Sequence, residues 1–510
     1  MSGGRGDRLV VLAFAAAAVV RCSPALLWPL TPDEAGFLLV ARQWDPATGH
    51  MYGGFWVDRP PQLIATFRLG DAVAGSYGPR ILAVALSVAS VLVAHRIGTL
   101  IGGRRAARWT AGLVLVVTSW PHLITWAAKS ESFGVPFVLI SCWLFVEAMH
   151  RTPGRSGIAA ALLAGFAAAL AMGMKQSLVG GVVFGGILLA ACWLTGRLER
   201  RTVVTYAAAA LAGFILPVSM ALGWVVSAGL SPSLLWEVLY GFRVEALDAI
   251  AAVESPANTR RAVALVLIAV GSGLAIVIAW FFLMMPRLAR GRGELTAATT
   301  AVLVVDVANL ALGGSYWPAY LHALVPPVAL ATALLCTLPG ARGTVPRVVV
   351  AFSVVPLLAS LVLDPVLRAD GQETTATGGA IGRAVREAAR PDDSVVVIYG
   401  APQVVLESGL DAPYRYLWSL PVRTLDADLD ELHALVSGPD APTWIVVRGR
   451  VNTWGLDSSG RVRATVAQRY ERVVRHCTVS IWRLRSAPRP DVPPVDCSRR
   501  FGPLADEWGL

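Results

Sequence analysis

Charged residues are scarce in this chain. Only 15% of its 510 residues carry a charge, whereas 55% are hydrophobic and the mean hydropathy is +0.59. Soluble globular domains carry about 25% charged residues, so this composition excludes an ordinary soluble protein. Apolar runs of roughly the 20 residues needed to cross a bilayer recur throughout residues 1–365. We therefore expect a polytopic membrane protein.

Cysteine is scarce as well, and its spacing excludes a structural metal site. None of the six cysteines is spaced like the ligands of a zinc site. Four lie in or beside apolar runs, where a free cysteine behaves as a small hydrophobic residue. Cys477 and Cys497 lie instead in the polar C-terminal region, which the topology below places on an oxidising side. A disulfide between these two residues is thus a prediction.

The basic residues are concentrated in short connections between apolar runs, so the net charge of +10 does not indicate a nucleic-acid partner. Arginines gather in alternate connections, at 102–108, 150–156, 196–202, 286–295 and 340–345. This positive-inside pattern predicts a cytoplasmic N-terminus, and an odd number of spans then places the C-terminal region outside the plasma membrane. We expect about eleven spans, at 9–30, 80–101, 109–127, 132–149, 157–172, 178–195, 203–228, 262–285, 296–313, 319–339 and 346–365.

Residues 366–510 are predicted to form a soluble extracytoplasmic α/β domain that follows the membrane region, residues 1–365. Apolar and β-branched runs at 394–399, 443–447 and 478–484 indicate strands, with a helix at 381–389. No catalytic or metal-binding spacing occurs in this part. The fold class is therefore an all-α polytopic membrane protein with a C-terminal α/β domain.

Two long outside loops, 31–79 and 229–261, interrupt the membrane region. The second loop is predicted to hold an interfacial helix with Trp236, Tyr240, Phe242 and Arg243. The first loop is rich in acids, which a membrane protein rarely concentrates beside its first span unless they cap a helix or perform chemistry.

The acidic loop opens with the signature of a helix start. In Thr31-Pro32-Asp33-Glu34, the threonine suits the N-cap, the proline suits the first helical position and the glutamate completes a capping box. Capping alone accounts for Glu34. It accounts less well for Asp33, because an acid in the first turn gains only ~0.3–1 kcal/mol from the helix dipole. A carboxylate can accept the proton of an attacking hydroxyl, so Asp33 is a candidate catalytic base.

The loop closes with Asp58-Arg59-Pro60-Pro61. Consecutive prolines fix the backbone and favour an extended preceding residue, so they hold Arg59 stiffly at the rim of the second span. A guanidinium in this place can bind a phosphate through two hydrogen bonds. The alternative is a structural salt bridge at the membrane interface that involves Asp58.

These motifs resemble the GT-C superfamily of polyprenyl-phosphate-sugar glycosyltransferases, in particular the protein O-mannosyltransferases and the aminoarabinose transferases that modify lipid A. The Asp33-Glu34 pair followed by D-R-P-P at 58–61 is similar to that family's first loop, where D-K-P-P is common. The segments KSESF at 129–133 and GSYWPAY at 314–320 are similar to its later outside loops. Together the motifs span most of residues 1–365.

Two positions depart from the family pattern. Arg59 stands in place of the usual lysine and keeps its charge, whereas Ala319 stands where a histidine is frequent. His322 lies three residues further along. The departure puts in doubt any role that the family gives to that histidine.

The resemblance implies an inverting glycosyltransferase. The donor would be a polyprenyl-phosphate-linked hexose or pentose, such as mannose or an arabinose-like sugar, and the acceptor a protein, glycolipid or polysaccharide of the envelope. No cofactor is assigned, and a divalent cation stays open. The resemblance implies catalytic roles for Asp33, Glu34 and Glu131, binding of the donor phosphate by Arg59, Lys129 and Lys175, and supporting positions for Asp58, Tyr320 and His322.

Structural roles are the alternatives at several positions. Lys129 and Lys175 could anchor helix ends by reaching to the membrane surface, and Glu131 could pair with Lys129. Asp306 in the ninth span is costly in lipid and so faces protein or water. Its apolar neighbours are more typical of helix packing than of catalysis.

A transporter or flippase of lipid-linked sugars is the alternative function. Transporters place polar groups near mid-span and often consist of repeated halves with broken helices. This chain has no detectable internal repeat, and its charges gather at the outer ends of the spans. A non-catalytic scaffold for envelope assembly is a third possibility, against which the clustered acids argue.

Overall fold

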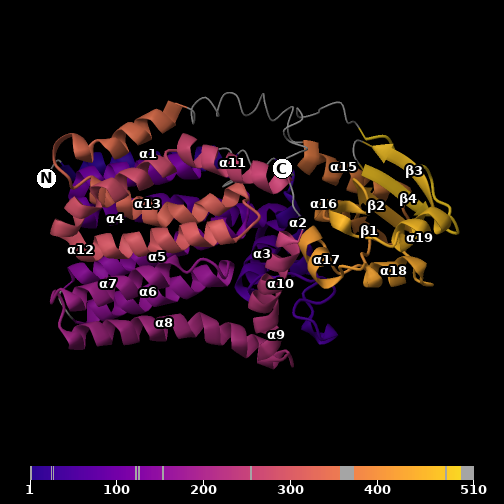
Figure 1. The fold of residues 1–510 in the computed structure, drawn as a ribbon, viewed down its shortest axis with the longest axis horizontal. Helices are drawn as coiled ribbons and strands as arrows, with labels where there is room; N and C mark the ends of the chain where they lie inside the picture. Colours follow the sequence, from indigo (N-terminus) through magenta and orange to yellow (C-terminus); the bar gives the residue numbers. More distant parts are fainter. Residues whose placement is uncertain are drawn as a thin grey trace. The chain divides into compact units, whose positions relative to one another are not determined.

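The computed structural model describes residues 3–23, 26, 28–120, 123, 127–151, 154–252, 256–355, 373–476 and 479–495. Among them, six helices are long and apolar enough to cross a membrane, and three shorter apolar helices accompany them. The predicted polytopic membrane fold with a small C-terminal sheet is confirmed (Figure 1). The chain forms two compact units, one of residues 1–27, 60–223 and 258–364, the other of residues 28–59, 224–257 and 365–510.

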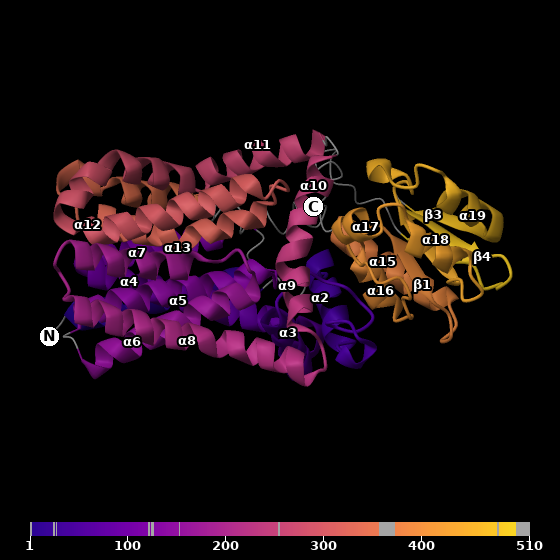
Figure 2. The same cartoon turned by 60° about the horizontal axis from the view of Figure 1, so that its bottom comes forward.

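The first unit is a bundle of apolar helices (Figure 2). Its longest helix, α4, breaks at Gly102 and Gly103, which separates the spans predicted at 80–101 and 109–127. Helix α12 breaks in the same way at Arg292, inside the arginine-rich connection expected there. The helices of the first unit are α1 (Gly3–Cys22), α3 (Pro61–Ala74), α4 (Gly78–Thr118), α5 (Ser130–His150), α6 (Arg155–Met174), α7 (Gly180–Leu194), α8 (Arg200–Ser227), α11 (Pro256–Gly271), α12 (Leu274–Leu312), the 3-10 helix η6 (Pro318–Leu324), α13 (Val325–Leu335) and Val345–Val355.

Two predicted spans differ in their boundaries. The span expected at 262–285 is interrupted between α11 and α12, where Gly273 has a φ of +80° that favours glycine. The span expected at 319–339 opens as the 3-10 helix η6, and Pro326 and Pro327 lie in the first turn of α13, where the missing N–H groups cost no helical hydrogen bond. The first change lies in the middle of its predicted span, and the second lies at the start of its span.

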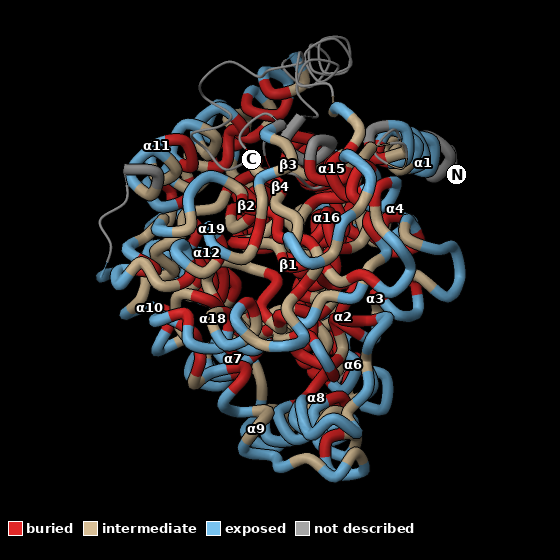
Figure 3. The backbone as a smooth tube through the Cα atoms, turned by 90° about the vertical axis from the view of Figure 1, so that its right-hand side faces the viewer, coloured by how far each residue is buried: buried red, intermediate tan, exposed pale blue. Residues whose placement is uncertain are grey.

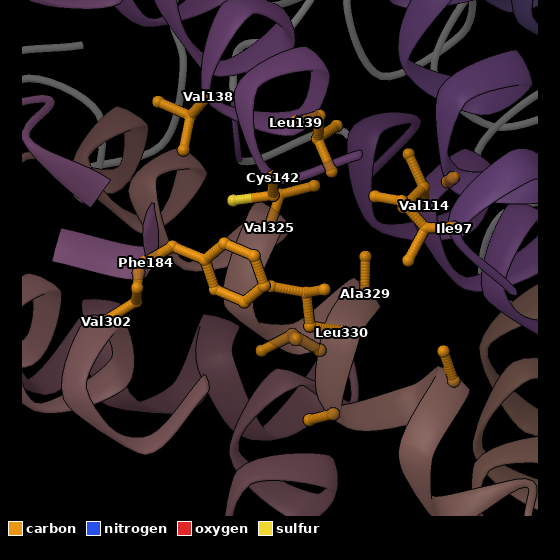
Figure 4. Close-up of a cluster of buried hydrophobic side chains, with 14 of the residues drawn as sticks. Ile97, Val114, Val138, Leu139, Cys142, Phe184, Val302, Val325, Ala329 and Leu330 are labelled. Carbon is orange, nitrogen blue, oxygen red and sulfur yellow. The ribbon is translucent and has the colours of Figure 1, made fainter. Parts of the chain in front are cut away.

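Helix α5 lies in the interior of the bundle. It is apolar on every side, as expected of a helix buried all round, and it packs against α4, α6, α7 and α13. Figure 4 shows Cys142 of α5 beside Phe184 of α7 and Val325 of α13; the first two side chains are 0% exposed. Cys142 is a free thiol, so its predicted role as a small hydrophobic residue is confirmed.

The second unit contains the α/β fold. Strands β1 (Val395–Ile398) and β2 (Trp444–Arg448) are parallel, β4 (Val479–Leu484) is antiparallel to β2, and β3 (Tyr470–His476) forms an edge, in the order β1-β2-β4-β3. The strands β1 and β2 lie among buried residues (Figure 3). The helices of this fold are α15 (Glu373–Ala388), α16 (Pro402–Ser408), α17 (Ser419–Leu425), α18 (Asp430–Ser437) and α19 (Arg461–Arg469).

Parts of both outside loops belong to this second unit. The first loop, 31–79, contributes α2 (Pro32–Arg42), which packs against α16, and Trp56, which forms a β-bridge with Tyr416. The second contributes α9 (Pro232–Trp236), a π-helical turn (Glu237–Gly241) and α10 (Phe242–Ala251), which packs against α17. The α/β fold is therefore packed directly onto the loop that carries Asp33.

Candidate functional site

The first group of site residues lies at the start of α2. Thr31 is the N-cap, and its hydroxyl oxygen accepts a hydrogen bond from the Glu34 N–H at 3.3 Å. The Glu34 carboxylate accepts in return from the Thr31 N–H at 2.8 Å and from the Thr31 hydroxyl at 2.9 Å. The predicted capping box is thus confirmed. Glu34 is 1% exposed, whereas Asp33 in the same turn is partly exposed, so Asp33 is the acid of this turn that a ligand can reach.

Asp58 lies between two guanidinium groups. It accepts from Arg59 at 2.7 Å and pairs with Arg243 of α10. Burial alone would raise the pKa of the Asp58 carboxyl, but the charges of Arg243 and Arg59 outweigh burial and lower that pKa below its ordinary value. Of the sequence alternatives, the structural ion pair at Asp58 is present. Arg243 lies in a helix, as predicted, and its guanidinium pairs with Asp58, whose side chain is 13% exposed.

Arg59 is held next to the helix that carries Asp33. Its guanidinium carbon lies 5.8 Å from the centroid of the Phe37 ring, and its backbone carbonyl accepts a hydrogen bond from the Tyr52 hydroxyl at 2.5 Å. Phe37 lies four residues after Asp33 in α2, which places both on one helix face. The Arg59 guanidinium therefore lies against the helix that carries Asp33.

The second group of site residues belongs to the helical bundle. Glu131 in the first turn of α5 is 6% exposed, and its carboxylate lies 2.6 Å from the Lys175 Nζ atom at the end of α6. The same Nζ atom lies 4.1 Å from the centroid of the Tyr320 ring of η6. Glu131 thus pairs with Lys175, a partner that the sequence did not suggest. The Lys175 side chain is only 14% exposed and points into protein, so it does not reach for the membrane surface.

His322 adjoins this group. It is 4% exposed, and its Nε2 atom has no hydrogen-bond partner among the residues that the structure describes. The charged groups that act on its ring are Glu131, Lys129 and Lys175. Three connections that the sequence placed on one side of the membrane, before α5, after α6 and at η6, are therefore brought together here.

One sequence signal for this group is residue usage. The chain has 44 basic residues, and only two of them, Lys129 and Lys175, are lysine. A chain that otherwise uses arginine everywhere has both of its lysines beside Glu131. Lysine carries a compact charge with rotatable donors, whereas arginine presents a rigid fork.

Other predicted residues lie apart or outside the described part. Asp306 is 3% exposed in α12, with its carboxylate near Gly180 in the first turn of α7, where a helix dipole favours a negative charge. Cys477 and Cys497 lie outside the described residues. Within the described ranges, no group of three His, Cys, Asp or Glu residues could hold a metal ion.

Comparison with known proteins shows which fold this chain has. No protein-family model matches the chain, and no curated protein matches it. The structure of ArnT from Cupriavidus metallidurans bound to undecaprenyl phosphate matches with a TM-score of 0.59 at 14% identity, over 92% of this chain and 97% of that one. The apo oligosaccharyltransferase of Archaeoglobus fulgidus matches with a TM-score of 0.53 at 12% identity, over 86% of this chain and 69% of that one.

A third solved structure agrees. Archaeal AglB from Archaeoglobus fulgidus, in complex with an inhibitory peptide and a dolichol-phosphate, matches with a TM-score of 0.52 at 12% identity, over 87% of this chain and 69% of that one. At such identities the likeness concerns the fold. The chain has the GT-C fold that these membrane glycosyltransferases share.

Proposed function

We propose that this protein is an integral-membrane, inverting glycosyltransferase. It takes a sugar from a polyprenyl-phosphate donor and transfers it to a hydroxyl group of an envelope acceptor at the outer face of the plasma membrane. One observation carries the proposal: Asp33 is partly exposed in the first turn of α2, which the Thr31–Glu34 capping box fixes, and the Arg59 guanidinium lies against the same helix at Phe37. The GT-C fold supports it.

Asp33 acts as the general base. Its carboxylate accepts the proton of the acceptor hydroxyl while that oxygen attacks the anomeric carbon, and direct attack inverts the configuration there. Glu34 supports Asp33 by holding the turn rather than by meeting substrate, because its carboxylate bonds to Thr31. Asp58 likewise does not meet substrate; it holds Arg59 in place through their ion pair.

The cations hold the donor phosphate. Arg59, Lys129 and Lys175 stabilise the negative charge that develops on the departing polyprenyl phosphate, as fixed cations do best where water is excluded. Glu131 and Tyr320 orient Lys175, through the ion pair and the ring contact. The donor class is supported by the solved structures of similar fold, which hold undecaprenyl phosphate in one case and a dolichol-phosphate in another.

The test is a transfer assay with purified protein in lipid nanodiscs. Radiolabelled polyprenyl-phosphate mannose and arabinose serve as donors, and a membrane extract supplies acceptors. Asp33→Asn should abolish transfer while the protein still folds and binds polyprenyl phosphate. Asp45→Asn is the matched control: Asp45 caps a 3-10 turn in the same loop, and asparagine caps equally well, so transfer should persist.

Each outcome has a distinct meaning. Equal transfer by wild type and Asp33→Asn would mean that Asp33 serves only the start of the helix, and it would overturn the assignment of the base. Absence of transfer by the wild type with any donor, combined with movement of the labelled lipid across vesicle membranes, would favour the flippase. The anomeric configuration of the product, read by NMR, tests inversion.

A further inference from the structure

The second group of site residues contains a buried polar atom for which the described residues offer no hydrogen-bond partner. The His322 side chain is 4% exposed on η6, yet its Nε2 atom meets no hydrogen-bond partner among the described residues. Buried polar atoms are satisfied in the great majority of native proteins, because an unsatisfied one costs folding free energy. An exception of this kind calls for an explanation, and a missing ligand is one.

The charges around His322 indicate the ligand. Lys129, Lys175 and Glu131 are the charged groups that act on the ring, and Lys175 is bound to Glu131 at 2.6 Å. Two of these groups are positive and one is negative, so positive charge is in excess among them. An excess of positive charge suits an anionic ligand such as a phosphodiester, which carries one negative charge.

The proposed reaction adds a second negative charge. The bond between the anomeric carbon and the phosphate oxygen breaks, and its electron pair stays on that oxygen. The acceptor oxygen forms the new bond to the anomeric carbon, and its proton passes to the Asp33 carboxylate. The phosphodiester with one charge thus becomes a phosphate monoester with two. The new charge appears on the oxygen that had carried the sugar, so a hydrogen-bond donor to that oxygen stabilises the transition state more than the substrate.

We propose that His322 is that donor. In its neutral form, with the proton on Nε2, the imidazole donates one hydrogen bond to the departing oxygen while the lysines hold the charge of the diester. This inference rests on the proposed function. It makes the site selective for polyprenyl phosphate in its monoester form over a diester. It also explains why Nε2 has no partner among the residues that the structure describes.

The test measures binding of two probes to the full-length protein in nanodiscs. Farnesyl phosphate is the monoester, and its methyl ester is the diester; microscale thermophoresis gives both affinities. We expect wild type to prefer the monoester about tenfold to a hundredfold, as a hydrogen bond to a charged group allows. His322→Met should lose this preference with its affinity for the diester unchanged. His322→Gln, which keeps a side-chain N–H donor, should retain much of it.

The two lysines report where the probes bind. A reagent that acylates amines can modify no side chains other than Lys129 and Lys175, because the chain has no other lysine. Protection of these two residues by either probe, read by mass spectrometry, locates the phosphate at this group. His433→Met in the α/β fold is the control variant and should change neither affinity.

The outcomes separate the two proposals. If both probes protect the lysines and His322→Met keeps the monoester preference, the inference about His322 is overturned and the proposed function stands. If neither probe binds the wild type at the lysines, the phosphate site fails and both fall. Because Nε2 has no partner within the described ranges, His322→Met should not lower the melting temperature. A large drop would show that the ring is structural.

Discussion

Two adjacent acids at the start of α2 serve different purposes. The Glu34 carboxylate closes the capping box, and Asp33 presents its carboxylate at the surface of the same turn. Glutamine also completes a capping box, so Glu34→Gln should keep both fold and most of the transfer activity. Asp33→Asn should leave the melting temperature unchanged and lower kcat by about 10²–10⁴-fold, the contribution typical of a general base. Comparison of kcat and thermal melting for the two variants checks this.

Asp58 makes the stability of the second unit depend on pH. Its folded pKa is lowered, so the fold favours the ionised form. The stability from its pairs with Arg59 and Arg243 is thus fully present above the ordinary pKa of 3.8 and is lost as pH falls through the lower folded value. The melting temperature, measured from about pH 2.5 to about pH 6, should fall more steeply toward acid pH for wild type than for Asp58→Asn. Parallel curves would contradict this.

Whether a contact of these residues could be predicted depends on how far apart its two residues lie in the sequence. The capping box follows from a pattern within four residues, so the sequence predicted it and the structure has it. The ion pair between Glu131 and Lys175 joins residues 44 positions apart, and nothing local in the sequence indicates it. Arg243 was missed as a partner of Asp58 for the same reason.

At the scale of elements, α2 meets Trp418, the N-cap residue of α17, at a glycine. A Cβ atom at Gly36 would lie 2.2 Å from the Trp418 ring, and that ring also contacts Phe37. Gly36→Val should therefore lower the stability of the second unit, by about 1–3 kcal/mol as overpacking does. Trp418→Ala in the same chain should recover part of that loss by making space. Denaturant titrations of the two single variants and the double variant give the coupling, and additive losses would show that the two residues do not meet.

The elements differ in how clearly the sequence marks them. Strands β1, β2 and β4 were predicted, because each is a run of apolar and β-branched residues. Strand β3 was missed, since YERVVRH mixes charged and apolar residues and contains a register shift between Arg472 and Val474. It lies at an edge of the sheet, where one side of the strand needs no apolar partner. In the sequence, Gly273 alone indicated the break between α11 and α12.

At the scale of the whole molecule, the second unit is discontinuous in sequence. It combines residues 28–59, 224–257 and 365–510, so the loop that carries Asp33 and the C-terminal fold depend on one another for packing. The sequence shows composition and local periodicity, and both change near residue 365, which is why the C-terminal fold was predicted as a separate domain. Packing between distant segments leaves no periodic trace in a single sequence.

This discontinuity predicts how a fragment of residues 366–510 behaves. The fragment keeps its sheet and the core around Val396, Ile445 and Tyr470, so it should fold. It lacks α2, which packs against α16, and α10, whose Ala249 carbonyl accepts a hydrogen bond from Arg423 of α17. Amide hydrogen exchange should therefore be faster in α16 and α17 of the fragment than in the full chain in nanodiscs.

The strands supply the internal control for that comparison. Exchange in β2 and β4 should be the same in fragment and full chain, because their hydrogen-bond partners lie within the fragment. Equal protection of α16 and α17 in both proteins would mean that the outside loops contribute nothing to the C-terminal fold. Faster exchange confined to the two helices would show that the α/β fold and the loop with Asp33 form one cooperative unit. A change on the α/β surface would then reach the turn that holds the proposed base, which is the physical requirement for a domain that senses the acceptor.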